Sequence, residues 1–299
     1  MKAVTHLDPA GDGPSRAVVV GAGGFVGTAV ADAIESHGVE TLRLRRADVD
    51  LVALDAARRL RTRLKPTDAV VLVAAKAPCR TYAGLRDNVA MMAAILDALT
   101  KLNPAHLVYV SSDAVYGDLP QPLSEKSVTA PQSLHGVMHL ARETMLRMGL
   151  PETPLGILRP TLIYGASDPH NGYGPNRFRR LAQSGQPIVL FGAGEERRDH
   201  VAVEDVAELA ARMVMHRSTG ILNAATGRVM SFMRIAELIV GLAPKPVAIT
   251  GAKRDGPMPH NGYRPFDTSA VAKAFPGFCF TPPEEGIRRM YEATEERVC

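Results

Sequence analysis

Four glycines within seven residues constrain the fold of this chain more than any other feature of its sequence. The segment reads Gly21-Ala22-Gly23-Gly24-Phe25-Val26-Gly27, and it directly follows an apolar, β-branched run at 17–20. Because glycine lacks a Cβ atom, the chain can turn tightly there and expose backbone N–H groups at the positive end of a helix. A plain strand-to-helix turn needs one or two glycines. Four of them predict a loop that accepts the pyrophosphate of a dinucleotide.

The rest of the chain alternates apolar, β-branched runs with amphipathic segments of helical length. This pattern predicts a parallel sheet covered by helices on both faces. Strands are expected at 17–20, 40–44, 69–73, 106–111, 156–158 and 220–223, and helices at 26–36, 55–63, 86–101, 134–147 and 203–216. Glycine and proline concentrate at 165–175, 192–194 and 251–265, which indicates a loop-rich second lobe.

Composition excludes several classes of protein. With 299 residues, of which 46% are hydrophobic, the chain can bury one large core or two lobes without disulfides. The longest apolar run, about 69–75, is too short to span a membrane, and the first sixteen residues lack an apolar signal core. Cys79, Cys279 and Cys299 have no metal-binding spacing. We therefore expect a cytoplasmic protein with a flexible arm at 1–16, no membrane partner and no resident metal.

The net charge of +4 comes with arginines in small groups. The group at 58–63 recurs at helical spacing and interleaves with Leu60 and Leu64, as on a solvated helix face. No aromatic stacking platform accompanies the charge, so nucleic acid is not an expected partner. Small anionic ligands fit the sequence better.

Arg45 and Arg46 follow the second predicted strand, where an acidic residue would accept a ribose 2′-hydroxyl. Guanidinium groups pair with a 2′-phosphate, which favours NADP(H) over NAD(H). Both arginines could instead face solvent, and Asp48 or Asp50 could serve NAD(H). Asp50 and Leu51 are expected to flank the adenine. Ala74 joins the predicted cofactor contacts, which also include Gly21, Gly23, Gly24, Phe25, Val26 and Gly27.

Five short segments, in their order and spacing, resemble the extended short-chain dehydrogenase/reductases of the NAD-dependent epimerase/dehydratase group. They span 21–27, 111–117, 158–165, 191–207 and 223–227. The resemblance implies a Rossmann-type dinucleotide-binding domain at 17–165 and 202–222. It also implies a smaller lobe at 166–201 and 223–299 that clasps a nucleotide-linked sugar, and a homodimer that pairs the helices at 86–101 and 134–147.

Within this resemblance, Ser112 falls on the catalytic Ser/Thr, whose hydroxyl hydrogen-bonds the reacting sugar oxygen. Asp113 follows as in the family's dehydratases, but Ala114 replaces their glutamate. Elimination of water needs both a base and an acid, so the replacement weakens the dehydratase interpretation. Ser112 and Asp113 could also simply cap backbone groups at the end of a strand.

The resemblance places His135 on the tyrosine and His139 on the lysine of the family's Tyr-x-x-x-Lys dyad. The two residues share one helix face, and imidazole, with an ordinary pKa of about 6.5, can exchange protons at neutral pH. His135 would then act as acid/base, and His139 would position the cofactor. Two alternatives are an abandoned dyad without hydride chemistry and a metal pair, although no third ligand is evident.

The resemblance assigns Tyr116, Asn176 and Arg177 to the substrate pocket. Arg198 and Arg264 fall on family arginines that contact a diphosphate, which two guanidinium groups could bind together. An ion pair at Arg198 and a solvent-exposed loop at Arg264 are the plainer alternatives.

These features lead us to expect an NAD(P)-dependent enzyme that reduces a ketone or epimerises a centre in a nucleotide-activated sugar. One alternative is a lyase or isomerase that moves protons only. Another is a catalytically inactive, dinucleotide-binding regulatory protein.

Overall fold

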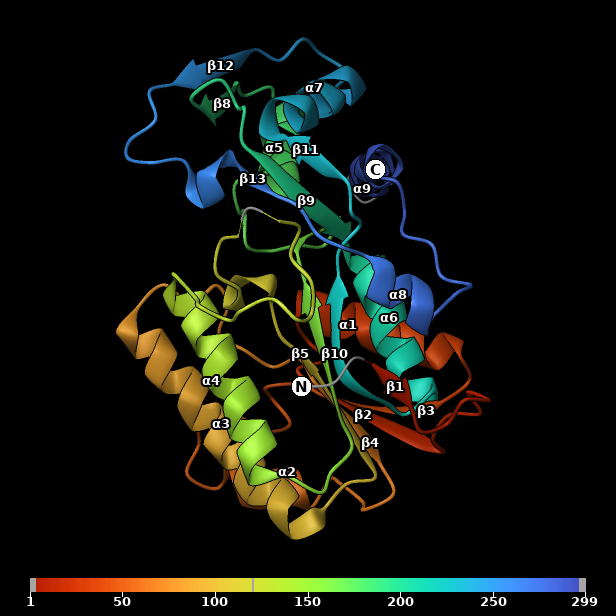
Figure 1. The fold of residues 1–299 in the computed structure, drawn as a ribbon. Helices are drawn as coiled ribbons and strands as arrows, with labels where there is room; N and C mark the ends of the chain where they lie inside the picture. The colour runs from red at the N-terminus through yellow and green to blue at the C-terminus, as the bar shows by residue number, and fades with distance from the viewer. Residues whose placement is uncertain (1–3, 120, 296–299) are drawn as a thin grey trace.

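A seven-stranded sheet forms the centre of the larger lobe in the computed structural model, which describes residues 4–119 and 121–295 (Figure 1). The strands are β1 Thr5–His6, β2 Arg16–Val20, β3 Glu40–Leu44, β4 Ala69–Leu72, β5 His106–Val110, β6 Leu155–Pro160 and β10 Ser218–Ala224. They lie in the order β1-β10-β6-β5-β4-β2-β3, and only β1 is antiparallel to its neighbour. Since the chain builds outward from β2 in both directions, the predicted doubly wound, Rossmann-type α/β fold is confirmed.

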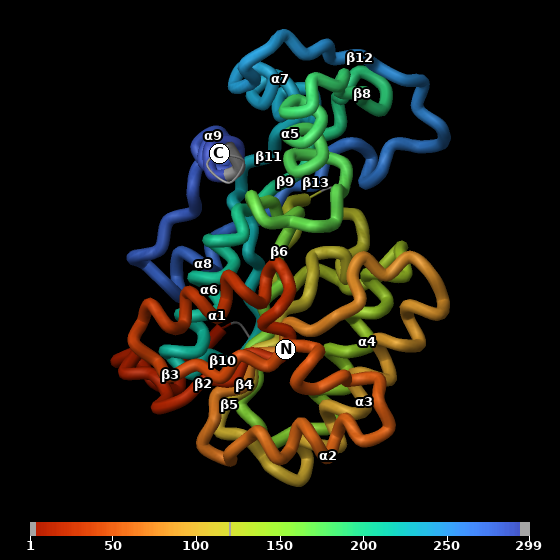
Figure 2. Tube along the Cα trace, turned by 180° about the vertical axis from the view of Figure 1, so that it is seen from behind, coloured from red at the N-terminus to blue at the C-terminus, as the bar shows by residue number. Residues whose placement is uncertain are grey.

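Alternating side chains along each strand give the sheet a core on both faces. The helices of this lobe are α1 Phe25–Ser36, α2 Ala56–Arg61, α3 Tyr82–Leu102, α4 Leu134–Gly149 and α6 Val203–Met215. Val19 packs in the core formed with α1 and α6, whereas Val18 packs in the core formed with α2, α3 and α4. Figures 1 and 2 show the two helical layers on opposite sides of the sheet.

Hydroxyl side chains decide where two of these helices begin. Thr81 Oγ1 accepts a hydrogen bond from the Gly84 N–H group at 3.1 Å, so α3 begins at Tyr82 rather than at the predicted residue 86. Ser133 Oγ accepts from the Gly136 N–H group at 3.1 Å, and α4 begins at the predicted residue, Leu134. The second cap fixes the helix that carries both site histidines.

The smaller lobe contains short strands and three helices above the sheet (Figure 2). Its elements are β7 Leu162–Tyr164, α5 Pro175–Gln183, β8 Ile188–Phe191, β9 Arg197–Ala202, β11 Val229–Ser231, α7 Phe232–Leu242, β12 Ile249–Ala252, β13 Tyr263–Arg264 and α9 Pro283–Glu295. Strand β9 pairs with β7, β11 and β13, and β8 pairs with β12. Phe178 of α5, Ile188 of β8 and Phe232 of α7 share its core.

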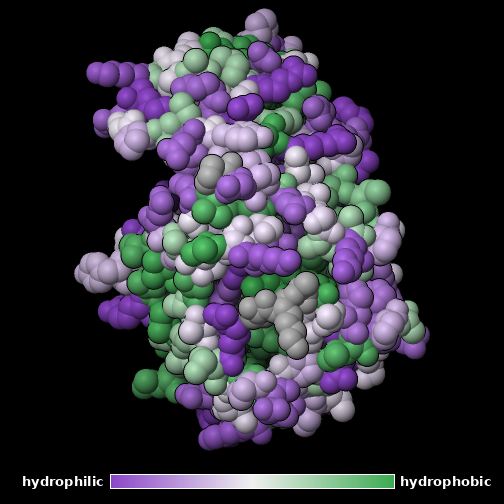
Figure 3. Space-filling view, viewed as in Figure 1, coloured by the Kyte–Doolittle hydropathy of each residue, from purple (hydrophilic) through white to green (hydrophobic). Residues whose placement is uncertain are grey.

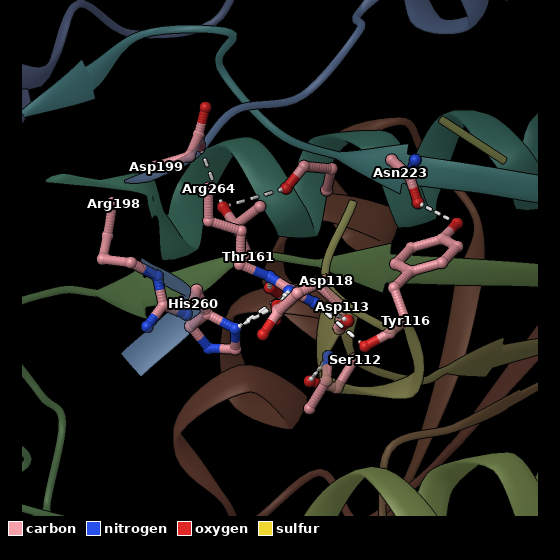
Figure 4. Close-up of polar contacts among 12 residues, drawn as sticks. Ser112, Asp113, Tyr116, Asp118, Thr161, Arg198, Asp199, Asn223, His260 and Arg264 are labelled. Atoms are coloured by element: carbon pink, nitrogen blue, oxygen red, sulfur yellow. Dashed lines mark hydrogen bonds and ion pairs between the residues drawn. The ribbon is translucent and has the colours of Figure 1, made fainter. Parts of the chain in front are cut away.

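Asp199 fixes two of the places where the chain passes between the lobes. Thr161 Oγ1, just after β6, donates to Asp199 Oδ1 at 3.0 Å (Figure 4). The Thr226 N–H group, just after β10, donates to the same oxygen at 3.0 Å. Burial raises the pKa of Asp199, and these hydrogen bonds oppose the rise. The buried carboxylate of Asp199 thus connects the two segments, after β6 and after β10, in which the chain passes between the lobes.

The expectation of a flexible arm at 1–16 does not hold for its described part. Strand β1 pairs with the edge of β10, and His6 Nδ1 lies 2.8 Å from Ser218 Oγ. The assignment of residues 223–299 to the smaller lobe also needs correction, because helix α8, Ser269–Ala274, contributes Val271 to the core around α1 and α6. Residues 1–3 of the arm and 296–299 of the lobe, with Cys299, lie outside the described residues.

Within the described ranges, no helix has both the length and the apolarity that crossing a membrane requires.

Candidate functional site

A cavity of about 600 Å³ lies where the carboxyl ends of the parallel strands meet the smaller lobe. Figure 3 shows the narrow waist of the molecule between the two lobes. The predicted site residues that line this cavity are Phe25, Val26, Ser112, Asp113, Tyr116, His135, His139, Asn176, Arg198 and Arg264. Ligands of open α/β sheets bind at this edge of the sheet. The fold therefore gathers residues from both lobes around one site.

Two glycines of the glycine-rich loop, Gly21 and Gly27, have no room for a side chain. A Cβ atom on Gly27 would lie 2.0 Å from the Gly21 carbonyl oxygen, and one on Gly21, with φ of +100°, would lie 2.6 Å from the Ala74 nitrogen. Gly23 and Gly24 are exposed, and Gly24 starts α1 without a side-chain cap. The residues present thus fit a dinucleotide, whose pyrophosphate would meet free N–H groups at the start of α1.

The two predicted 2′-phosphate arginines lie at the surface beside this loop. The side chain of Arg45 passes 3.3 Å from the place of a Cβ on Gly23, which puts it next to the exposed part of the loop. Arg46 is 75% exposed and pairs with Asp50 across 3.3 Å. Leu51 is buried in the core and is 6% exposed. Of the expected adenine contacts, Asp50 is thus the more accessible.

Ser112 and Asp113 follow β5 at the floor of the cavity. Ser112 Oγ accepts a hydrogen bond from the Ala114 N–H group at 3.2 Å, and its hydroxyl still carries a hydrogen to donate into the cavity. Asp113 is buried and begins a short 3₁₀ turn, Asp113–Val115 (Figure 4). Ser112 therefore both caps the turn, as the plainer interpretation holds, and remains able to bind a ligand.

His135 faces the cavity from the first turn of α4. The Cys79 N–H group donates to His135 Nδ1 at 3.4 Å, so the ring proton of the neutral imidazole lies on Nε2. Burial lowers the pKa of His135, and the Asp113 carboxylate raises it. The ring is thus favoured in its neutral form, with Nε2 as a hydrogen-bond donor.

His139 lies one turn along the same helix face and is 5% exposed. Its ring stands nearly perpendicular to that of His135, with centroids 4.7 Å apart, and its Nδ1 lies 2.7 Å from the hydroxyl oxygen of Tyr109. Burial, together with the neighbouring His135 and Arg142, holds the pKa of His139 well below its usual range. His139 therefore shares the cavity with His135, but it does not carry the charge of a lysine.

Arg264 reaches from β13 into a cluster of carboxylates. Its Nε lies 3.2 Å from Asp113 Oδ2, and its Nη1 lies 2.6 Å from Asp118 Oδ1 (Figure 4). His260 Nδ1 also contacts that Asp118 oxygen, at 2.5 Å. The arginine is only 2% exposed within this network, rather than exposed in a loop as the plainer alternative held.

Tyr116 points away from a ligand in the cavity. Its hydroxyl donates to Asn223 Oδ1 at 2.7 Å, and the Arg159 guanidinium lies 4.8 Å from its ring centroid (Figure 4). Burial raises the pKa of Tyr116 to about 12. Its phenol is therefore engaged in the protein core, although Tyr116 is among the residues that line the cavity.

The remaining predicted substrate residues lie in the smaller lobe. Asn176 lines the cavity, and its Oδ1 accepts from the Gly165 N–H group at 3.1 Å. Arg198 lines it too, is 12% exposed, and pairs with Glu196 across 3.4 Å. Arg177 lies exposed on α5 and is not among the lining residues. The structure thus brings Asn176 and Arg198 to the cavity, but not Arg177.

Several lining residues were not assigned to the site from the sequence, among them Arg80, Asp168, His170, Tyr173 and His260. Four of these five lie in the glycine- and proline-rich stretches at 165–175 and 251–265. Those stretches signalled loops but gave no indication of which side chains turn inward. In the part of the chain that the structure describes, no group of three or more His, Cys, Asp or Glu residues is placed to hold a metal ion.

The fold and the cavity define an α/β protein of the class that binds dinucleotides at a glycine-rich turn. The chain belongs to the NAD dependent epimerase/dehydratase family, whose model matches residues 17–225. The resemblance inferred from the five segments is thus confirmed, and the family is one of enzymes.

Solved structures of similar fold cover nearly the whole chain. The UDP-glucose 4-epimerase of Thermus thermophilus, in complex with NAD, is 22% identical with a TM-score of 0.78, over 94% of this chain and 99% of that one. The UDP-N-acetylglucosamine 4-epimerase from Bacillus cereus is 23% identical with a TM-score of 0.79, over 94% and 96%. RMD from Pseudomonas aeruginosa, complexed with NADPH, is 20% identical with a TM-score of 0.80, over 95% and 100%.

Proposed function

We propose that the protein is an NAD(P)-dependent enzyme that reduces a ketone or epimerises a centre in a nucleotide-activated sugar. His135 takes the place of the family's catalytic tyrosine, and Ser112 holds the reacting oxygen. The observation that carries this proposal is the placement of the Ser112 hydroxyl and the His135 ring in the wall of one cavity, beside the start of the glycine-rich helix.

The protonation state of His135 suits it to a carbonyl or hydroxyl oxygen. With Nδ1 accepting from the Cys79 N–H group, Nε2–H is the ring donor left for the cavity. A neutral imidazole that donates to a carbonyl stabilises negative charge developing on the oxygen, and Ser112 can donate to the same atom. This arrangement supports ketone chemistry more directly than elimination of water.

Asp113 offers little support for the lyase or isomerase alternative. The buried guanidinium of Arg264 lies 3.2 Å from its Oδ2, so this carboxylate is already paired. Asp113 instead holds the turn that presents Ser112.

A nicotinamide dinucleotide would lie along the glycine-rich loop, with Phe25 and Val26 between the pyrophosphate site and the cavity. When bound, it accepts or donates a hydride. Arg45 supports NADP(H) as the preferred form, because its side chain lies beside Gly23 at the mouth of the loop. The structural neighbours include complexes with NAD and with NADPH, so they do not distinguish the two.

The substrate class follows from the smaller lobe and from the neighbours, which include UDP-sugar epimerases. Arg198 reaches the cavity with one weak partner, Glu196 at 3.4 Å, and would pair with a diphosphate. Arg264 is held by Asp113 and Asp118, so we assign it to shaping the site rather than to the diphosphate.

We further propose a homodimer that pairs α3 and α4 of two copies, in the cytoplasm. Apolar side chains on these helices are exposed, namely Tyr82 at 82%, Val137 at 38% and Met148 at 78%. Figure 3 shows apolar surface at the lower left, over the region that Figure 1 labels α3 and α4. Light scattering of wild type and of Met148→Glu tests this: loss of the dimer in the variant supports it, and a monomeric wild type overturns it.

Turnover of His135 variants tests the proposed enzyme. UDP-, GDP- and dTDP-sugars are added to wild type, His135→Ala and the control His37→Ala, whose ring lies on the surface beside Glu208. Nicotinamide absorbance reports ketone reduction, and chromatography of the sugar epimers reports epimerisation, which leaves the cofactor unchanged overall. We expect His135→Ala to lose about 10²–10⁴-fold in kcat, the usual worth of a positioned acid/base, and His37→Ala to lose nothing.

Equal turnover in wild type and His135→Ala removes His135 from the mechanism. Tight cofactor binding with no turnover on any of these sugars favours the regulatory alternative. Turnover that persists after verified removal of the cofactor favours the proton-only alternative.

A further inference from the structure

Arg142 is a fully buried cation on the same helix as the two site histidines. It follows His139 by three residues, and its side chain is 0% exposed. Its Nη2 donates to the Ala74 carbonyl oxygen at 2.7 Å, and its guanidinium carbon lies 5.3 Å from the Tyr109 ring centroid. In the described part of the chain, no carboxylate forms an ion pair with it. Burying a guanidinium without an anionic partner costs folding free energy, so this buried charge needs a structural or functional reason.

The nearest acidic residue in sequence is committed elsewhere. Glu143 pairs with Arg159 across 2.6 Å and accepts a hydrogen bond from Ser111 Oγ at 2.6 Å. Because Arg159 neutralises the charge of Glu143, Glu143 does not neutralise the charge of Arg142. The charged group is hydrogen-bonded to the Ala74 carbonyl oxygen and lies on the helix that carries both histidines.

Tyr109 links this charge to the histidine pair. Its hydroxyl oxygen lies 2.7 Å from His139 Nδ1, and burial raises the pKa of this phenol to about 12. A protonated phenol has one hydrogen to donate, and in the arrangement proposed below His139 Nδ1 accepts it while the ring proton lies on Nε2. Tyr109 thereby fixes both the orientation and the tautomer of His139.

We propose that Tyr109 and Arg142 support the histidine pair in place of the family's lysine: Tyr109 holds the ring of His139, and Arg142 supplies a fixed positive charge beside it. This inference rests on the proposed function. His139 occupies the lysine position in the sequence but stays neutral, and the charge is supplied one turn deeper by Arg142. Tyr109 and Arg142 are positioning residues, because they act through His139 and His135 rather than on the substrate.

The charged groups on the neighbouring turn after β5 and on α3 do not supply a buried cation beside His135 and His139. Asp113, from the turn after β5, is the anion that raises the pKa of His135. On α3, which packs against α4, Arg86 is 75% exposed, and Asp87 pairs with Lys76 across 2.6 Å at the surface. Arg142 is therefore the buried cation that lowers the pKa of His139.

Nitrogen-15 NMR of the imidazole rings in the full-length protein tests the role of Tyr109. In wild type, His139 should show a single tautomer with the proton on Nε2, and Tyr109→Phe should convert it to a mixture. Tyr164→Phe is the matched control, since that buried phenol lies in the core of the smaller lobe. An unchanged His139 tautomer in Tyr109→Phe overturns the positioning role.

The same spectra, recorded across a pH series, test the role of Arg142. Removing the cation in Arg142→Met should raise the pKa of His139 by about one unit or more, the size of a near-neighbour charge effect, and Arg142→Lys should restore the low value. An unchanged pKa in a folded Arg142→Met overturns the charge role. If Arg142→Met does not fold, Arg142→Gln, which keeps a donor for the Ala74 carbonyl oxygen, takes its place with the same expectation. An unchanged His139 pKa in a folded Arg142→Gln then overturns the charge role.

These readouts are independent of turnover, so failure of the two proposals can be distinguished. Undiminished turnover in His135→Ala together with the expected NMR changes removes His135 from the proposed mechanism and leaves the placement of the charge standing. Loss of turnover in His135→Ala with unchanged NMR signals overturns only this inference.

Discussion

Arg264 Nε lies 3.2 Å from Asp113 Oδ2, so strand β13 of the smaller lobe is ion-paired to the turn that carries Ser112. Both side chains are buried, at 2% and 7% exposure. The smaller lobe is thus connected directly to the turn that carries Ser112, the residue proposed to hold the reacting oxygen. The pair gives the site a rigid connection across the cavity.

Removing this guanidinium should destabilise the protein strongly. We expect Arg264→Leu to lower the free energy of unfolding by about 3–5 kcal/mol, because it leaves two carboxylates without their cation. Urea unfolding measures the change. Arg288→Leu, which removes an exposed arginine on α9 beside Glu285, is the control and should have a far smaller effect. Equal losses of unfolding free energy in the two variants would show that the buried ion pair contributes no more than an exposed one.

A methyl group in the glycine-rich loop should impair cofactor binding. In Gly27→Ala the added Cβ would lie 2.0 Å from the Gly21 carbonyl oxygen, so the loop must shift. Overpacking typically costs about 1–3 kcal/mol, which corresponds to about a 5- to 150-fold loss of affinity for NADPH if the strain appears in the bound loop. Calorimetric titration measures it. Gly241→Ala, where no heavy atom lies within 4 Å, should leave the affinity unchanged.

Arg45 and Arg46 should discriminate between the two nicotinamide cofactors. Replacing both with alanine should weaken NADPH binding about tenfold or more and leave NADH binding nearly unchanged, since only the former carries a 2′-phosphate. Fluorescence titration with both cofactors measures the ratio. Arg43→Ala is the control, because Arg43 is paired with Glu35 across 2.7 Å. A parallel loss for both cofactors would contradict the NADP(H) preference.

His106 should make stability depend on pH in the acid range. Its Nε2 donates to the Ser218 carbonyl oxygen at 2.8 Å, and burial lowers its pKa from 6.5 to about 4. Between these values the unfolded chain binds a proton that the folded chain excludes, so stability rises with pH. The contribution of His106 to stability should fall by about 3 kcal/mol as the pH drops from about 6.5 to about 4.

Urea unfolding at several pH values checks this slope. His106→Gln, which keeps a donor for the Ser218 carbonyl oxygen, should flatten it in this window, and His37→Gln, at the surface, should not. The prediction fails if His106→Gln unfolds with the same pH slope as wild type.

The main elements of the fold could be predicted because they follow local patterns. The glycine-rich loop placed β2 and α1, and the strand at 40–44 was predicted with its observed bounds. Strand β1, with two residues, and helix α8, with six, carry too little pattern to be read from the sequence. Both are stabilised by tertiary contacts with β10 and the core around it.

The site divides in the same way. His135 and His139 could be placed in one cavity because their spacing on a helix is fixed by the sequence. The contact of Tyr109 with His139, thirty positions apart, depends on how β5 lies against α4, which no local pattern determines. The pairing of Arg264 with Asp113 joins even more distant segments.

Strand β1 also covers part of the edge of the central sheet, with which another copy of the chain could otherwise pair. Thr5 and His6 occupy the hydrogen-bonding edge of β10, opposite Thr219 and Ser218. An uncovered edge strand offers its backbone to any other extended chain, and this is a common route to self-association and fibre growth. Removing the residues before β2 would therefore leave the glycine-rich loop in place but expose the edge of β10. Such a shortened chain should lose solubility before it loses activity.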